Sequence, residues 1–387
     1  MKKYIAFFAA GLMLLASLSC KEKGRQAAGT QSVQAEESSA TVVNLKYAKG
    51  FSVKTLADGT RLVDVADPQK DKDKMPASYH FALVQRGTKA ADVPEGYTVV
   101  EVPIERTIVM TMLQLSNFTA LDAHDVVKGI TGTKNLFDED IHRRVKDGSM
   151  VKIGMEGNFD PELILAANPE VIFISPFKRG GYDAIKETGI TLIPHLGYKE
   201  LDPLGQAEWV KYVAMFVGKE RQANELFDSI EHRYNTIKER VAQTKERPTV
   251  FSGEMHGGNW FAVGGKNYLA QIFRDAGAEY VMKDDNTGGV PIEYEKMYAT
   301  AANADYWRIL NSFPGDFSYE ALKASEPRNE LFKAFKEWHV IYCNMKQTPY
   351  YEISPVMPDV VLSDFVAIFH PELMPKDYQP RFYRLLQ

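Results

Sequence analysis

Short apolar runs and amphipathic segments alternate along most of the chain. Thr107–Met112 form an apolar run, Leu113–Ala123 have helical spacing, a helix opens at Asp160, and Val171–Ser175 form the next run. This alternation is typical of α/β layers with a largely parallel sheet. We therefore expect an N-terminal lobe over residues 101–218.

The same pattern returns in the second half of the chain. An Ala-Ala-Asn tripeptide occurs at residues 166–168 and again at 301–303, each time between a helical segment and an apolar run. A repeat at matching positions favours two lobes of similar build over one large sheet. The second lobe is expected over residues 248–387, with a strand at Thr249–Glu254, helices at Asn267–Ala276 and Glu295–Ala302, and a strand at Tyr306–Leu310.

A long helical pattern separates the two halves. Apolar residues keep helical spacing from Val210 to Val217 and, after Gly218, from Ala223 to Val241, and Pro248 ends the pattern. The second segment predicts a helix of roughly 37 Å at about 1.5 Å per residue. We expect residues 219–247 to form a stiff interlobe connector that permits small tilts and resists wide opening.

A small β-rich extension precedes the lobes, over residues 41–100. Thr41–Leu45, Phe51–Thr55 and Arg61–Val65 have the composition of short strands, and the last two are joined around Asp58-Gly59, a good tight-turn dipeptide. The expected fold is therefore α/β, with two similar lobes whose central sheets are flanked by helices, one long interlobe helix and this extension.

Composition and charge narrow the function classes. The 387 residues are 45% hydrophobic and 25% charged, which fits a globular body and neither a disordered chain nor a polytopic membrane protein. The formal net charge is −5. Because phosphate binding depends on clustered Lys and Arg, we expect no nucleic-acid partner.

The N-terminus has the pattern of an export signal. Two lysines precede an uncharged run that ends at Leu18, too short for a membrane span. The small residues before Cys20 resemble a bacterial lipobox, with Ser17 where leucine is usual. We expect a signal peptide over residues 1–19 and lipidation of Cys20. The alternative is ordinary signal cleavage beside an incidental cysteine.

The segment after Cys20 is polar and has no aromatic residue, so residues 20–40 are expected to be a flexible tether. The remaining cysteine, Cys343, would then have no intrachain partner. These features place the protein in the cell envelope, in the periplasm and anchored to a membrane.

The common catalytic and metal-binding motifs are absent from the sequence. It contains no H-E-x-x-H, C-x-x-C, G-x-S-x-G or G-x-G-x-x-G motif, and its eight histidines show no ligand-like pairing. We therefore expect a protein that is not an enzyme, holds no cofactor and has no resident metal.

Several segments, in serial order, resemble the periplasmic-binding domain for iron complexes and vitamin B12, the capture component of ABC importers. The resemblance covers roughly residues 102–371. The segments are Arg106–Met110, Gly129–Gly132, Gly154–Pro169 and Gly253–Trp260 with Gly264-Gly265.

The resemblance implies that one glutamate at the top of each lobe forms salt bridges with arginines of a permease. Glu162 matches the first position. Glu295 is the most similar at the second, although the segment that follows it is two residues longer than its counterpart, which leaves Glu293 as a rival. Acidic residues in a first helical turn also face the positive end of the helix dipole, so each position alone has an ordinary structural explanation.

The ligand is expected between the lobes, in loops that leave strand ends. Aromatic candidates there suit a corrin, a porphyrin or an aryl siderophore, and the basic pair Lys178-Arg179 suits carboxylate or catecholate groups. Core packing is the ordinary alternative for Trp260, Phe177 and the tyrosines. The candidate ligand-binding residues are Met112, Gln114, Phe177, Lys178, Arg179, His256, Asn259, Trp260, Tyr350 and Tyr351.

We therefore predict a monomeric, lipid-anchored substrate-binding protein of an ABC importer. It would capture an iron-siderophore or haem complex, or cobalamin, and deliver it to the permease and its ATPase. One alternative is a binding protein for bare zinc or manganese, which would need three or four converging His, Asp or Glu ligands. Another is an exported enzyme that uses His256 and Glu254 as acid and base.

Overall fold

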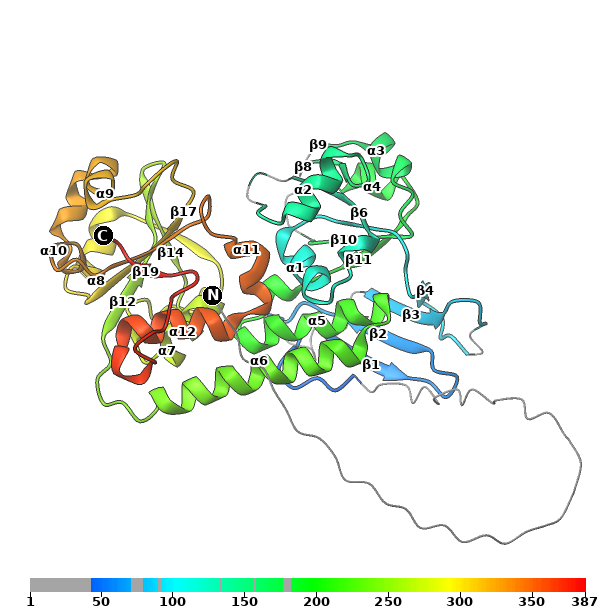
Figure 1. Ribbon diagram of the computed structural model, residues 1–387, viewed down its shortest axis with the longest axis horizontal. Coiled ribbons are helices and arrows are strands. Elements are labelled where there is room, and N and C mark those ends of the chain that lie inside the picture. Colours follow the sequence, from blue (N-terminus) through cyan, green and yellow to red (C-terminus); the bar gives the residue numbers. More distant parts are fainter. Residues whose placement is uncertain are drawn as a thin grey trace, which may run out of the picture. The chain divides into compact units, whose positions relative to one another are not determined.

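The computed structural model describes residues 43–70, 79–89, 92–132, 134, 136–155, 158–176 and 182–387. The predicted signal peptide, Cys20 and the predicted tether lie outside these residues. Figure 1 shows two α/β lobes and, beneath them, a layer of long helices that runs along both.

The N-terminal extension is a four-stranded sheet in the order β1-β2-β3-β4. The first two strands form an antiparallel hairpin at the predicted residues, and Gly59 has the positive φ of 85° that this turn requires. Residues 43–45 do not form the first predicted strand. The strands are β1 (Phe51–Thr55), β2 (Arg61–Val65), β3 (Tyr79–Gln85) and β4 (Thr98–Val102).

Two buried glutamates fix the start of this extension to the N-terminal lobe. Glu208 accepts hydrogen bonds from the backbone N–H groups of residues 46–48, at 2.8–3.1 Å. Glu200 accepts from the N–H groups of Lys49 and Gly50, each at 2.8 Å, and from Trp209 Nε1 at 3.0 Å. Charge-assisted bonds of this kind are stronger than neutral ones, so the extension is bound firmly to the lobe.

The N-terminal lobe contains a parallel sheet in the order β11-β10-β5-β6-β7. Its strands are β5 (Thr107–Val109), β6 (Val127–Ile130), β7 (Val151–Lys152), β10 (Val171–Ile174) and β11 (Thr191–Pro194), and β8 (Gly154–Met155) and β9 (Asn158–Phe159) form a separate small hairpin. The helices are α1 (Met112–Ala120), α2 (Glu139–Lys146), α3 (Pro161–Ala166) and α4 (Asp183–Lys186), with 3-10 turns η1 (His124–Val126) and η2 (Gly197–Lys199).

The C-terminal lobe contains a sheet in the order β15-β12-β17-β18-β19, in which only β19 is antiparallel. Its strands are β12 (Thr249–Ser252), β15 (Glu279–Tyr280), β17 (Tyr306–Asn311), β18 (Val340–Asn344) and β19 (Arg384–Leu385), beside a small sheet of β13 (Glu254–His256), β14 (Asn259–Val263) and β16 (Gly289–Ile292). The helices are α7 (Tyr268–Asp275), α8 (Tyr294–Ala301), α9 (Tyr319–Ser325), α10 (Lys333–Lys336), α11 (Tyr350–Ile353) and α12 (Pro358–Phe369), with η3 (Pro327–Leu331), η4 (Ser354–Val356) and η5 (Pro371–Leu373).

The two lobes share an order of four parallel strands, β6-β5-β10-β11 in one lobe and β15-β12-β17-β18 in the other. The fifth strand differs, since β7 lies beyond β6 in the N-terminal lobe and the antiparallel β19 lies beyond β18 in the C-terminal lobe. The Ala-Ala-Asn tripeptides lie between α3 and β10 and between α8 and β17. The structure therefore confirms the expectation of two lobes of similar build.

The interlobe helix is present at the predicted place, and it does not stand alone. It is α6 (Glu220–Val241), which follows α5 (Pro203–Val217) after Gly218, a left-handed residue that ends α5. One face of α6 is buried, and the helix packs against α5 and α12. One hydrophobic core is continuous from the extension through α5 and α6 to α12, so the lobes share a common helical layer.

Candidate functional site

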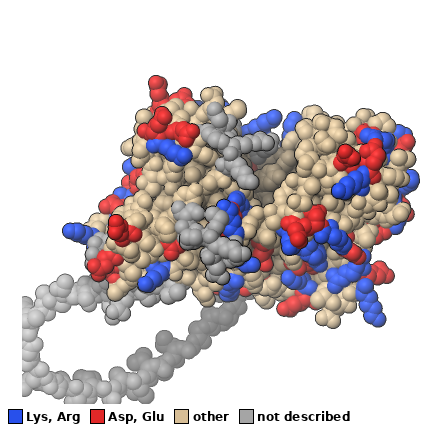
Figure 2. All heavy atoms as spheres, turned by 180° about the vertical axis from the view of Figure 1, so that it is seen from behind, with Lys and Arg blue, Asp and Glu red and all other residues tan. Residues whose placement is uncertain are grey.

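The candidate binding region of this architecture lies at the carboxyl ends of the parallel strands of the two lobes. Ligands of open α/β sheets bind beyond these strand ends. Figure 2 shows the molecule from behind, with a hollow between the two lobes and with acidic and basic side chains interspersed over both.

The first candidate segment follows β5 and begins α1. Thr111 caps the helix, and Met112 is half-buried at its first position. Gln114 is fully buried. Its Oε1 accepts from Met110 N at 2.7 Å and its Nε2 lies 3.0 Å from Ser175 Oγ, so it ties the ends of β5 and β10 together. Gln114 is therefore a structural residue here, and a direct ligand contact is not supported.

A short helix of the C-terminal lobe reaches across to the N-terminal lobe. It is α11, which packs against α1 and carries both predicted tyrosines, with Tyr350 buried and Tyr351 50% exposed. Glu352 on the same helix accepts from Phe137 N at 2.7 Å and Asp138 N at 3.0 Å. Burial raises the pKa of Glu352, and the two N–H groups counteract that effect. The tyrosines thus lie at the junction of the lobes.

The N-terminal extension also contacts both lobes. Gln69, in the loop after β2, donates from Nε2 to Lys199 O at 2.9 Å and accepts from Thr287 Oγ1 at 2.8 Å. Lys199 and Asp67 form an ion pair of 2.5 Å beside it. The lobes are therefore joined by side-chain contacts as well as by helices.

The hairpin of β13 and β14 separates the three candidates that it carries. His256 and Asn259 are exposed at its tip, where they flank the Gly257-Gly258 turn. Trp260 has no exposed surface and packs among the rings of Phe251, Trp307 and Phe332. Trp260 is therefore a core residue, and the prediction that it contacts ligand is not supported.

Glu254 and His256 do not form an acid–base pair in this structure. Glu254 accepts from Asn311 Nδ2 at 3.1 Å, and burial raises its pKa. Within the described residues, no hydrogen bond joins Glu254 to His256, whose side chain is exposed at the hairpin tip. The arrangement gives no support to the enzyme alternative.

Sequence reasoning missed a buried basic group near the tyrosines. Arg308, on β17, is 7% exposed, and its guanidinium donates to the Tyr383 hydroxyl through Nε at 3.1 Å and through Nη2. Arg308 has no ion pair with any described residue. An isolated arginine within an apolar run carries no sequence signal for this position.

The two predicted docking glutamates occupy equivalent positions. Asp160 is the N-cap of α3 and Glu293 the N-cap of α8, so Glu162 and Glu295 are each the second residue of their helix. The longer segment after Glu295 is explained by helix length, since α3 has 6 residues and α8 has 8. Counted from the helix start, Glu295 and not Glu293 is the counterpart of Glu162.

The surroundings of these two glutamates differ. Glu162 is exposed and has no ion pair with a described residue. Glu295 pairs with Arg328 Nη1 at 3.1 Å, and Arg328 is itself held over the Tyr294 ring, 3.9 Å from its centre, and paired with Glu326 at 2.8 Å. The C-terminal lobe therefore partly neutralises its own glutamate.

Three ligand candidates, Phe177, Lys178 and Arg179, lie outside the described residues. In the part of the chain that is described, no three His, Cys, Asp or Glu side chains are grouped to hold a metal ion. None of the described helices has the length and apolar character needed to cross a bilayer.

Comparison with known proteins gives one family and several relatives. A sequence model of the family described as periplasmic binding protein matches residues 109–346. Two uncharacterized lipoproteins of Methanocaldococcus jannaschii are similar. One is 29% identical over 85% of this chain and 82% of its own length, and the other is 26% identical over 96% of each chain.

Solved structures share the fold at low identity. A periplasmic heme binding protein from Pseudomonas aeruginosa has a TM-score of 0.59 and 16% identity over 73% of this chain and 98% of its own. A protein of an ABC-type Fe3+-hydroxamate transport system from Saccharomonospora viridis has a TM-score of 0.54 and 16% identity over 69% and 94%. S. aureus IsdE, solved with heme, has a TM-score of 0.53 and 19% identity over 68% and 98%.

Proposed function

The chain belongs to the periplasmic binding protein family, and from this premise we propose that it is the substrate-binding lipoprotein of an ABC importer for an iron complex. The ligand would be an iron-siderophore, haem or a cobalamin, bound between the lobes and delivered to a permease. Structural neighbours whose names state haem or Fe3+-hydroxamate support this ligand class. Lipoprotein relatives and the lipobox-like residues before Cys20 support a lipid anchor in the cell envelope.

The observation that carries the proposal is the equivalence of the two lobes. Both share the order of four parallel strands, and both place a glutamate at the second position of the helix that follows the small hairpin or sheet. Two carboxylates at equivalent ends of one body can set the register and orientation of a partner that carries matching arginines. A purely local explanation through the helix dipole would not require the two positions to correspond.

The mechanism is binding without chemistry. The shared helical layer of α5, α6 and α12 resists wide opening, so we expect ligand capture to need only a small tilt of the lobes. The proposed ligand contacts among the described residues are Met112, His256, Asn259, Tyr350 and Tyr351. Further proposed contacts are Phe177, Lys178 and Arg179. Docking of both lobes on the permease would bias the pair toward the open state and release the ligand.

A ligand screen tests the ligand class. The purified protein is titrated with haem, ferric siderophores and cobalamins, and thermal stability is followed. A ligand at a hundred times its dissociation constant stabilises the folded state by about 2.7 kcal/mol. We expect one class of ligand to raise the midpoint of thermal unfolding in a saturable way. The Tyr351→Ala variant should show a smaller rise. If no iron complex and no cobalamin binds, the proposed ligand class is wrong.

A second experiment tests the docking surface. ATPase stimulation of the cognate permease in liposomes is measured with Glu162→Gln, Glu295→Gln and the double variant. We expect the double variant to lose stimulation with ligand affinity unchanged, and Glu162→Gln to cost more than Glu295→Gln because Glu295 already has an intrachain partner. Glu239→Gln, on the exposed face of α6, is the matched control. Equal stimulation by all four proteins would contradict the docking role.

A further inference from the structure

A small cavity lies where the end of β18 meets the C-terminal segment of residues 380–384. Its volume is about 230 Å³, which is enough for a small oxyanion with a few waters. Thr348, one of its lining residues, lies two positions before α11, the helix that packs on α1 of the other lobe. The lining residues are Tyr342, Cys343, Asn344, Gln347, Thr348, Pro380, Arg381, Phe382, Tyr383 and Arg384.

The charge of this cavity is one-sided. Among the described residues that line it, two are arginines and none is acidic. Neither Arg381 nor Arg384 has an ion pair within the described part of the chain. Arg308 adds a third positive charge, because its guanidinium binds the hydroxyl of Tyr383, which lines the cavity.

The effect of these charges is visible at Cys343, inside the cavity. Burial raises the pKa of its thiol to about 12, and Asp364 acts in the same direction, whereas Arg308, the hydrogen bond of Thr348 and Arg384 act in the opposite direction. The positive charges of Arg308 on β17 and Arg384 on β19 therefore both act on the thiol of Cys343.

The carboxylates in the neighbourhood accept hydrogen bonds from neutral donors. Asp364 is fully buried and accepts from the Tyr378 hydroxyl at 2.6 Å and from the backbone N–H groups of residues 381–383 at 2.7–3.0 Å. Glu254 is bonded to Asn311, and Asp316 lies 3.3 Å from Gln347 Nε2. Asp364 thus shapes the loop that carries Arg381, whose guanidinium donates through Nη1 to Met357 Sδ at 3.7 Å.

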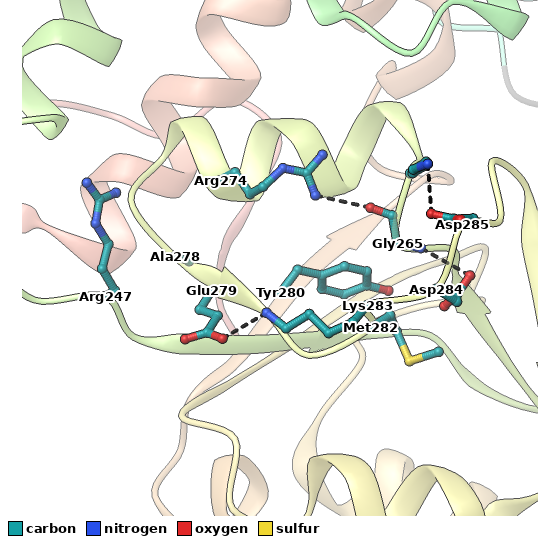
Figure 3. A pocket seen from close by; sticks show the side chains of 11 residues that line it. Arg247, Gly265, Arg274, Ala278, Glu279, Tyr280, Met282, Lys283, Asp284 and Asp285 are labelled. Carbon is teal, nitrogen blue, oxygen red and sulfur yellow. Dashed lines mark hydrogen bonds and ion pairs between the residues drawn. The ribbon is translucent and has the colours of Figure 1, made fainter. Parts of the chain in front are cut away.

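A larger cavity at the β15 edge of the same sheet shows the opposite case. It has a volume of about 640 Å³ and several basic residues around it (Figure 3). Its lysines are paired, Lys266 with Asp285 at 2.7 Å and Lys283 with Glu279 at 2.8 Å, and Arg274 donates to Gly265 O at 3.1 Å. Basic residues alone do not make an anion site, and the absence of acidic partners distinguishes the smaller cavity.

We propose that the cavity between β18 and residues 380–384 is a subsite for a small oxyanion or a carboxylate, held by Arg381 and Arg384 with Arg308 behind Tyr383. Planar guanidinium groups match carboxylate and phosphate oxygens in bidentate geometry. The anion comes from one of two sources, free phosphate or sulfate, or an acidic group of the captured ligand. The second source rests on the proposed function.

The test uses the purified protein and the double variant Arg381→Gln/Arg384→Gln. Arg221→Gln, an exposed arginine on α6, is the matched control, and Arg384→Lys keeps the charge without the fork geometry. Circular dichroism and the denaturation midpoint establish that each variant is folded. The probes are inorganic phosphate, haem with its two propionates, and haem dimethyl ester, which has no carboxylate.

Two results support the subsite and separate its sources. Saturable phosphate binding that weakens at least tenfold in the double variant, and not in Arg221→Gln, identifies free anion as the occupant. If phosphate does not bind, a ligand carboxylate is identified as the occupant when the double variant weakens haem binding at least tenfold and leaves the affinity for the ester unchanged.

The inference is wrong if phosphate does not bind and the double variant changes the affinities for haem and for its ester by the same factor. It is also wrong if neither phosphate nor haem binds. Failure of the proposed function is a different result, since it requires that no iron complex and no cobalamin binds, whatever phosphate does.

Discussion

The two lobes share the order of four parallel strands and have different interiors. In the N-terminal lobe, the side of the sheet beneath α3 is mainly aliphatic, with Ile108, Ile153, Ile164, Ile172 and Ile174. In the C-terminal lobe, the corresponding core around α8 is aromatic and includes Phe251, Trp260, Tyr294, Trp307 and Phe332. The comparison shows that strand order depends on the placement of apolar residues along the chain, and much less on which apolar residues fill the core.

The lobes also differ at the surface. Glu162 has no ion pair with a described residue, whereas Glu295, at the equivalent position, pairs with Arg328. Because paired surface charges contribute little to stability, this difference should have little effect on folding. Four changes sharpen or break the comparison.

The largest effect is expected in the cores. Trp260→Ala should lower the free energy of unfolding by about 4 kcal/mol and Ile164→Ala by about 3 kcal/mol, because both side chains are fully buried and leave cavities. Urea denaturation followed by circular dichroism measures both. Trp260→Phe is the informative control. If it left stability unchanged and abolished ligand binding, Trp260 would be a ligand contact and not a core residue.

The second effect is specific to the N-terminal lobe and depends on pH. His195 follows β11, is fully buried against Trp209, and burial lowers its pKa to about 3. As the pH falls below about 6.5, His195 takes up a proton in the unfolded chain and not in the folded chain. Its contribution to the free energy of unfolding is therefore complete above pH 6.5 and is lost progressively as the pH falls toward 3.

This loss should be about 1.4 kcal/mol per pH unit from this one group. Denaturation of the wild type and His195→Met at pH 7, 6, 5 and 4 measures it. The variant should show a slope shallower by that amount, and Leu196→Met, a buried neighbour that does not titrate, should keep the wild-type slope. Parallel slopes for all three proteins would show that His195 takes up its proton in the folded state.

The third effect concerns the contact that joins the lobes. Glu352→Ala removes the acceptor of two N–H groups and should cost about 2 kcal/mol, since hydrogen bonds to charged groups contribute about 1.5–3 kcal/mol. Hydrogen exchange at the amides of Phe137 and Asp138 should accelerate. Glu352→Gln should recover part of the protection, and Glu239→Ala on α6 should change nothing. Unchanged exchange in Glu352→Ala would show that the lobes do not depend on this contact.

The smallest effect is expected at the paired glutamate. Arg328→Gln should leave the denaturation midpoint unchanged, because the pair with Glu295 is exposed to solvent. It should, however, make Glu295→Gln as costly for permease stimulation as Glu162→Gln. If the two glutamates remained unequal in the Arg328→Gln background, Arg328 would not be the cause of their difference.

The sequence alone predicted the elements whose signals are local. The hairpin of β1 and β2, the helix start at Asp160 and the long helix α6 lie where turn residues, caps and 3.6-residue periodicity indicated them. The repeated alternation of helical and apolar segments predicted two similar lobes, because the Ala-Ala-Asn tripeptide recurs in it at the same junction of helix and strand.

Only the tertiary structure decided which of these residues are available to a ligand or partner. Gln114 and Trp260 have the residue types of a binding site and are buried, since a side chain's exposure depends on elements distant in the chain. The same holds for Glu352, whose partners lie more than two hundred positions away, and for the arginines around Cys343. Periodicity and caps act over a few residues, whereas burial and charge pairing are set by packing between elements, so the sequence determined the framework and the fold determined the chemistry.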